Sequence, residues 1–157
     1  IELLWENGCD LIWNETQSHW DEIEIICKFC SNNELPFAIS LFFTDKLTLL
    51  SGEPLHEIIQ LIENFSPQVI GFNCIKQSTF ESYIQKYSLP SKWGFYFNCG
   101  SGNVCDEFIS CGIEPQSLAK KIKPLLGLNP LFVGSCCGSS PDHTRAIKEL
   151  FNEAYRN

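Results

Sequence analysis

Five apolar runs of strand length recur along the 157-residue chain, and their spacing constrains the fold more than any other feature. Each run is continuously apolar rather than alternating with polar residues, which is typical of strands buried on both faces of a parallel sheet. Segments with helical periodicity separate the runs, so we predict an α/β fold of alternating strands and helices. The predicted strands cover residues 10–16, 37–45, 68–74, 92–100 and 131–138.

The segments between the predicted strands carry the apolar spacing of amphipathic helices. Ser18 followed by Asp21 resembles a capping box at the start of the first helix, and Pro54 suits the first turn of the second. Pro124 is expected to stop or kink the fourth helix. The predicted helices cover residues 20–30, 54–62, 78–88, 115–127 and 140–156.

Five strand-then-helix units imply right-handed crossovers, and their spacing of roughly 25 to 35 residues suits a (β/α) barrel. A complete barrel needs eight units and about 250 residues, so five units cannot close one. Residues 1–157 are therefore either the C-terminal part of a barrel domain or an open, doubly wound sheet of five strands. The first residues, up to Gly8, read as the end of a helix, which indicates that the chain begins inside a larger domain.

Composition argues against several classes of function. The formal net charge is -8 and the 11 lysines and arginines are scattered, so neither nucleic acid nor an anionic membrane is an expected partner. No apolar run reaches the roughly 20 residues of a membrane helix, and no basic start leads into an apolar leader segment. Nine cysteines, an odd number, do not suggest the disulfide framework of a secreted domain. We expect a cytoplasmic protein with reduced thiols.

Several cysteines are expected to be structural or incidental. Cys27 and Cys30 have CxxC spacing but lie on the apolar face of a predicted helix. We interpret this pair as small buried hydrophobic side chains. Cys9, Cys105 and Cys111 lie in predicted turns and loops, and we interpret them as free thiols without a role.

Cys74, Cys136 and Cys137 end predicted strands, and the C-terminal edge of a parallel sheet is where ligands bind. Three thiolates gathered there would make a zinc site with an open fourth position, which is typical of catalytic zinc. Small residues around the adjacent pair, such as Gly134 and Gly138, allow the sharp turn that two neighbouring ligands need. A vicinal disulfide, or two packed thiols, is the alternative for Cys136 and Cys137.

Two segments, VIGFNC and FVGSCCGSSPDHTRAI, resemble the zinc-binding signatures G-x-N-C and G-G-C-C-G-[ST]-[ST]-P-x-H-I of the homocysteine S-methyltransferase family. GCDLIWNET is similar to that family's G-x-D-x-x-x-x-E-T strand end, LLSGEPLHEII to the segment after its next strand, and FYFNCG to its Y-x-N-x-G element. The matches follow the family's order along the whole chain. The resemblance implies a (β/α)8 barrel of about 300 residues, with this chain as strands four to eight.

The resemblance also implies roles for individual residues. The three strand-end cysteines match the family's zinc ligands, and Glu15 matches an acidic residue that holds the amino group of homocysteine. Asn73 and Asn98 match polar positions that line the same pocket. On the residues alone, Glu15 could instead cap the helix near Ser18, and both asparagines could satisfy loop backbone. His143, one turn into the last predicted helix, is interpreted as a surface residue.

The sequence departs from the family pattern at some positions. Ser135 replaces the first of the usual paired glycines, a change that keeps the turn feasible. The run FNCGSGNVCDE lacks the usual order of asparagine, serine, glycine and glutamate, so no glutamate is carried over from it. The family's first strand, which brings another acidic substrate contact, has no counterpart here.

The function implied by the resemblance is zinc-dependent transfer of a methyl group from an onium donor to the thiol of homocysteine, which forms methionine. Coordination to zinc deprotonates a thiol and so makes it a better nucleophile at neutral pH. The candidate donors are S-methylmethionine, S-adenosylmethionine, betaine or a methylated cofactor carried by another domain. Trp93, Phe95 and Tyr96 are candidates for cation–π contacts with such a donor, with core packing as the alternative.

Two other classes of function are compatible with the sequence. A partial barrel could bind zinc or respond to thiol oxidation without catalysis, since an open barrel exposes sheet edges that need a partner. That partner would be the missing N-terminal half of the barrel or a second copy of the chain, so activity of the chain alone is not assured. A redox enzyme that uses Cys136 and Cys137 as a vicinal pair would leave Cys74 unexplained.

Overall fold

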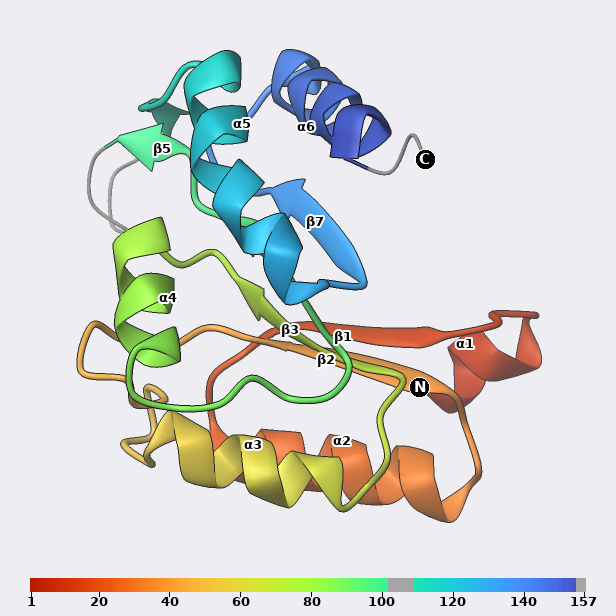
Figure 1. The fold of residues 1–157 in the computed structure, drawn as a ribbon. Coiled ribbons are helices and arrows are strands. Elements are labelled where there is room, and N and C mark those ends of the chain that lie inside the picture. Colours follow the sequence, from red (N-terminus) through yellow and green to blue (C-terminus); the bar gives the residue numbers. More distant parts are fainter. Residues whose placement is uncertain (102–108, 155–157) are drawn as a thin grey trace.

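The computed structural model describes residues 1–101 and 109–154, and a parallel sheet of five strands lies at its centre (Figure 1). The strands are β1 (Ile12–Gln17), β2 (Phe37–Leu41), β3 (Val69–Asn73), β4 (Trp93–Phe97) and β7 (Phe132–Ser135). Their order is β1-β2-β3-β4-β7, and every neighbouring pair is parallel. Each strand lies within or overlaps a predicted apolar run, so the expected α/β alternation is confirmed. β2 and β3 are buried along their whole length, whereas the edge strands β1 and β7 are partly exposed.

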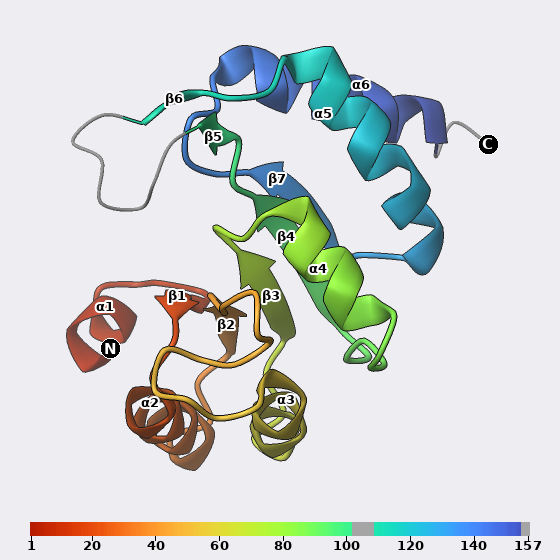
Figure 2. The same cartoon turned by 90° about the vertical axis from the view of Figure 1, so that its left-hand side faces the viewer.

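Helices cover one face of this sheet. They are α2 (Trp20–Asn32), α3 (Leu55–Glu63), α4 (Gln77–Ile84), α5 (Pro115–Ile122) and α6 (Pro141–Ala154). The short helix α1 (Glu2–Glu6) precedes β1 in the chain and lies beside it. Figure 2 shows the strands in an arc, with α2, α3 and α4 along its outer side and α5 packed against α6 next to β7. The predicted last helix extends past Ala154 into residues outside the described part. Within residues 1–101 and 109–154, no helix is long and apolar enough to cross a membrane.

Local sequence signals at helix ends are partly confirmed. α5 ends at Ile122 and gives way to a 3-10 helix at Lys123–Leu128, as the position of Pro124 predicts. The expected capping box at Ser18 is wrong, because this side chain is buried and its Oγ accepts the N–H of Leu50.

A small element that the sequence pattern does not predict is the two-stranded antiparallel sheet formed by β5 (Gly100–Ser101) and β6 (Ser110–Cys111). Each strand has two residues, which is too short to leave a periodic signal. The sheet brings the start of the segment before α5 close to the end of β4.

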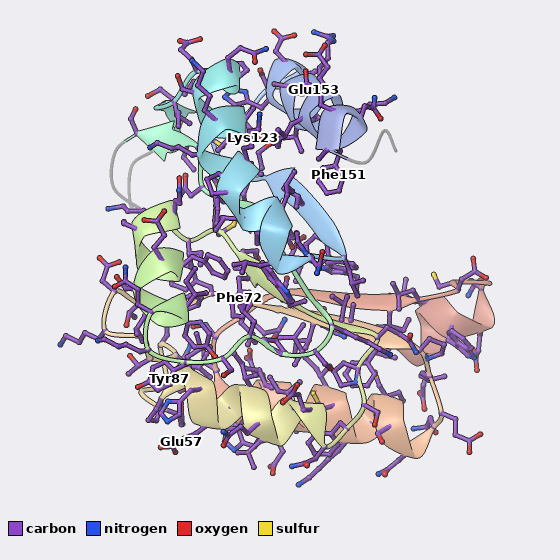
Figure 3. All side chains as sticks on the ribbon, viewed as in Figure 1. Glu57, Phe72, Tyr87, Lys123, Phe151 and Glu153 are labelled. Carbon is purple, nitrogen blue, oxygen red and sulfur yellow. A yellow bond between two sulfur atoms is a disulfide. The ribbon has the colours of Figure 1, made fainter. Side chains whose placement is uncertain are left out.

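Aromatic side chains form the core between the sheet and α4, and Figure 3 labels one of them, Phe72 of β3. The ring centroid of Phe80 on α4 lies 5.3 Å from that of Phe72, 5.6 Å from Trp93 and 5.7 Å from Phe95. All four side chains are buried. Trp93 and Phe95 are therefore core residues on the helix-covered face, and the core alternative for them is correct.

The opposite, inner face of the sheet is strongly curved. The ring of Phe132 on β7 lies over Gly94 of β4, where a Cβ atom would come within 2.2 Å of it. The same ring contacts Trp13 of β1, with centroids 5.0 Å apart. In a flat sheet, strands β1 and β7 would be about 19 Å apart, since neighbouring strands are spaced by about 4.8 Å. The five strands therefore form a concave arc, as a segment of a barrel does.

Candidate metal centre

Cys74, Cys136 and Cys137 lie together at the C-terminal edge of the sheet. Cys74 follows β3 and Cys136 follows β7, and these two strands flank β4. The N–H of Cys74 donates to the carbonyl oxygen of Tyr96 at 3.1 Å, and the N–H of Cys136 donates to that of Phe97 at 2.8 Å. Both chain segments are thus fixed to the end of β4. As a result, the three Sγ atoms lie within 4.8 Å of one another in a partly exposed position.

A tight turn presents Cys136 and Cys137. The N–H of Ser139 donates to the carbonyl oxygen of Cys136 at 3.0 Å. Gly138 has a φ of +77°, and a Cβ atom there would lie 2.5 Å from the Cα of Gly100. Glycine is needed at this position for both its left-handed conformation and the close backbone contact.

Replacement of Gly138 by alanine is expected to lower the free energy of unfolding by about 1–3 kcal/mol, because the new methyl group meets backbone in a strained conformation. The same change should also weaken metal binding by displacing the neighbouring cysteines. Urea denaturation and zinc titration of the reduced variant measure the two effects. Gly127→Ala is the matched control, since a Cβ atom at Gly127 would meet no atom of residues 1–101 and 109–154 within 4 Å. A Gly138→Ala variant as stable as the control would contradict this role of Gly138.

The three sulfur atoms can serve either in a disulfide or as metal ligands. Cys74 and Cys136 form a disulfide in the structure, with Cα atoms 5.7 Å apart, and the Sγ of Cys137 lies 3.6 Å from that of Cys136. Reduction would yield three adjacent thiols, and three thiolates with a free fourth position fit zinc. Because a disulfide sulfur is no longer a thiolate, only the reduced chain can bind the metal through all three residues.

The remaining described cysteines are not part of this cluster, and burial disfavours the thiolate form of three of them. Burial raises the pKa of Cys27 to about 12 and also raises the pKa of Cys30, and both side chains are fully buried, as predicted. Burial likewise raises the pKa of Cys99, whose Sγ donates to the carbonyl oxygen of Phe97. Cys105 lies outside the described residues. Two further free thiols are exposed, Cys9 and Cys111.

Glu15 has an exposed side chain near the end of β1, and Tyr96 of β4 binds its carboxylate. The Tyr96 hydroxyl donates to Oε1 of Glu15 at 2.5 Å. Burial, together with this hydrogen bond, raises the pKa of Tyr96 to about 12, so its hydroxyl remains a donor at neutral pH. The N–H of Trp20 at the start of α2 donates to Ser51 Oγ, so Glu15 does not act as the cap there.

Asn73 is completely buried beside Cys74, and only the nitrogen of its side-chain amide has a hydrogen-bond partner within the described residues. Its Nδ2 donates to Oγ1 of Thr16 at 2.6 Å. Its Oδ1 has no hydrogen-bond partner within the described part of the chain. An unpaired buried oxygen costs about 1–3 kcal/mol, so a donor from a bound ligand or water would be stabilising here.

Asn98 follows β4, and no hydrogen bond within the described part of the chain joins it to Glu15 or Asn73. Its Oδ1 accepts the N–H of Gly100 at 2.7 Å, which fixes the turn after β4. It also lines a cavity of about 500 Å³ beside the N-terminus of α4, together with Lys76. The described lining of this cavity includes none of the three clustered cysteines.

Comparison with known proteins decides the family. A family model described as homocysteine S-methyltransferase matches residues 1–151. The chain belongs to the homocysteine S-methyltransferase family. The resemblance in the sequence is thereby confirmed.

Solved structures of a homocysteine methyltransferase have the same fold as this family member. The metallated form of MmuM from Escherichia coli matches with a TM-score of 0.72 and 22% identity, over 94% of this chain and 47% of that one. The apo form matches with the same TM-score and identity, over 95% of this chain and 52% of that one. The five-stranded sheet thus corresponds to part of a homocysteine methyltransferase barrel, and the chain spans about half the length of these structures.

Sequence reasoning did not identify all of the polar residues that surround Glu15 in the structure. From the sequence, Tyr96 was only a candidate for cation–π contacts, whereas in the structure its hydroxyl donates a hydrogen bond to Glu15. Ser40 is completely buried in β2, and a single serine inside the apolar run FAISLFF is the signal that could have marked it. Thr16 has a φ of +58°, which a β-branched residue rarely adopts and sequence does not reveal.

The expectation that His143 lies on the surface is wrong, because its side chain is 1% exposed. Its Nδ1 accepts the N–H of Ser140 at 3.0 Å, and its Nε2 donates to the carbonyl oxygen of Ile113 at 2.8 Å. The segment before α5 packs over the first turn of α6 and covers the ring. His143 therefore links these two parts of the chain, and neither of its ring nitrogens is free to bind metal.

Replacing His143 with alanine is expected to lower the free energy of unfolding by about 2–4 kcal/mol, since it leaves two backbone groups unpaired and removes a buried ring. His19→Ala is the matched control, because His19 is exposed and its side chain does not cap α2. Urea denaturation followed by circular dichroism compares the two variants. Equal stability of the His143 variant and the control would show that the two hydrogen bonds contribute little.

Proposed function

We propose that this chain is the C-terminal part, strands four to eight, of a cytoplasmic zinc-dependent enzyme that moves a methyl group to the thiol of homocysteine and forms methionine. The donor would be S-methylmethionine, S-adenosylmethionine or betaine. The observation that carries the proposal is the convergence of three cysteine sulfur atoms within 4.8 Å at the C-terminal edge of a parallel sheet. Family membership supports homocysteine as the acceptor.

The roles of the residues follow from their chemistry. Thiolates of Cys74, Cys136 and Cys137 would hold zinc, which when bound keeps a substrate thiol in its nucleophilic thiolate form. The carboxylate of Glu15 would bind the ammonium group of homocysteine, and the unpaired Oδ1 of Asn73 would accept a hydrogen bond from the same substrate.

The proposed transfer is balanced without a redox partner. The homocysteine sulfur supplies an electron pair to the methyl carbon, and the bond between that carbon and the donor's sulfur or nitrogen breaks. The donor leaves as a neutral thioether or amine, so one positive charge is lost with the methyl group. An onium donor suits a site built from thiolates and a carboxylate, because its charge is attracted to theirs. Asn98 is the third residue that we propose to line the substrate pocket, with its Oδ1 held by the N–H of Gly100.

The rest of the barrel would have to come from another segment. The edge strands β1 and β7 each have one neighbour in the described sheet, and about half of each MmuM structure has no counterpart in this chain. Unpaired strand edges favour association with further strands. An N-terminal half barrel, or a second copy of this chain, is the partner we propose.

One alternative has an observation in its favour. A catalytically inactive partial barrel could bind zinc or sense thiol oxidation, and the disulfide between Cys74 and Cys136 is the pairing that oxidation would produce. In that function, zinc release would accompany disulfide formation.

A methyl-transfer assay separates the two functions. The reduced, zinc-loaded chain is incubated with homocysteine and each donor, alone and with a separately produced N-terminal half of E. coli MmuM, and methionine is measured by mass spectrometry. We expect methionine from at least one donor in the mixture and none when Cys74 is replaced by serine. Full zinc loading without methionine in any combination would contradict the enzymatic proposal and favour the alternative.

A further inference from the structure

A series of hydrogen bonds on the inner face of the sheet ends on the carboxylate of Glu15. The hydroxyl of Tyr96 donates to Oε1 of Glu15 at 2.5 Å, and its oxygen lies 3.0 Å from Oγ of Ser40. The backbone N–H of Thr16 donates to the same Oγ at 3.3 Å. Because the one proton of Tyr96 is given to Glu15, Ser40 donates to the tyrosine oxygen. The hydrogen bonds therefore run in one direction, from the N–H of Thr16 through the hydroxyls of Ser40 and Tyr96 to the carboxylate of Glu15.

The contact depends on the curvature of the sheet. β1, which carries Glu15, and β4, which carries Tyr96, are separated by β2 and β3. In a flat sheet, these strands would lie about 14 Å apart. The concave arc brings the two side chains together across its inner face. The buried Ser40 of β2 forms a hydrogen bond with the hydroxyl of Tyr96. A hydrogen bond to a carboxylate contributes more than one between neutral groups.

We propose that Tyr96 is a positioning residue, which holds Glu15 by Oε1 and leaves Oε2 for the ammonium group of an amino acid thiol. The inference rests on the proposed function, in which Glu15 binds the amino group of homocysteine. A carboxylate that is already fixed loses less conformational freedom when a ligand binds. Tyr96 therefore favours thiols that carry an amino group over thiols that lack one.

The first test compares two ligands of the reduced, zinc-loaded chain by isothermal titration calorimetry. Tyr96→Phe should raise the Kd for homocysteine about tenfold, because the charge-assisted hydrogen bond to Glu15 is lost. The Kd for 4-mercaptobutyrate, which has the thiol but no amino group, should stay unchanged, as should the zinc content. Tyr83→Phe is the matched control, since Tyr83 is a buried tyrosine whose hydroxyl donates to the carbonyl oxygen of Ser88 at 3.3 Å on the helix-covered side.

The outcomes of this test are separable. Unchanged affinity of Tyr96→Phe for homocysteine would overturn the inference, and so would equal weakening for both ligands, which would mean a general structural effect. A natural chain that binds zinc but no homocysteine would contradict the proposed function itself.

The second test needs no substrate. Urea midpoints are measured for Glu15→Ala, Tyr96→Phe and the double variant. If Tyr96 holds Glu15, the double variant should shift the midpoint clearly less than the sum of the two single shifts, since both changes remove the same interaction. Additive shifts would overturn the inference whether or not homocysteine binds.

Discussion

Replacing both Cys136 and Cys137 with serine is expected to abolish zinc binding by the reduced chain. The variant loses two of the three sulfur atoms that lie within 4.8 Å of one another. A serine hydroxyl is not ionised at neutral pH and is a poor ligand for zinc, so affinity should fall by several orders of magnitude. Elemental analysis after gel filtration should find about one zinc per natural chain and none per variant.

The matched control for this experiment changes two other cysteines. Cys9 and Cys111 are exposed free thiols. A variant with Cys9→Ser and Cys111→Ser therefore also replaces two cysteines with serine, but outside the cluster. It should retain the zinc of the natural chain. Equal zinc in both double variants would contradict the assignment of the metal centre.

The second large effect is expected in the core. Phe80→Ala should lower the free energy of unfolding by about 3–5 kcal/mol, because the ring is completely buried and packs against four other aromatic rings, those of Phe72, Trp93, Phe95 and Phe97. Since the stability of a domain is about 5–15 kcal/mol, this loss would remove at least about a fifth of it. Urea denaturation under reducing conditions measures the change.

An exposed apolar residue provides the comparison for Phe80. Leu61 on α3 is 43% exposed, so Leu61→Ala should change the free energy of unfolding by no more than about 0.5 kcal/mol. A loss below about 1 kcal/mol for Phe80→Ala would mean that the aromatic cluster repacks around the cavity.

The strand positions could be predicted from the sequence because burial on both faces leaves a direct pattern. β2 and β3, buried along their whole length, lie inside continuous apolar runs. The cap of α2 could not be predicted in this way. Ser18 has the right residue type at the right position for a cap. Its Oγ instead accepts the N–H of Leu50, which belongs to a loop distant in the sequence. Local patterns report local structure, and tertiary contacts then override some of them.

The site likewise has features that the sequence predicts and features that depend on tertiary contacts. That Cys74 and Cys136 lie at the same edge was predictable, because all strands of a parallel sheet end at one edge. Their close approach also depends on the strand order, in which β3 and β7 flank β4. The contact between Glu15 and Tyr96 joins residues 81 positions apart and requires both the strand order and the curvature of the sheet. His143 was assigned to the wrong environment for a related reason, since a short segment before α5 covers it and leaves no periodic signal.

The most direct test of the metal centre is zinc K-edge X-ray absorption on the reduced, zinc-loaded chain, with and without homocysteine. We predict three sulfur ligands and one lighter ligand without homocysteine, and four sulfur ligands with it. A sulfur count that does not change on addition of homocysteine, or a count of fewer than three in the natural chain, would contradict a thiolate centre built from Cys74, Cys136 and Cys137.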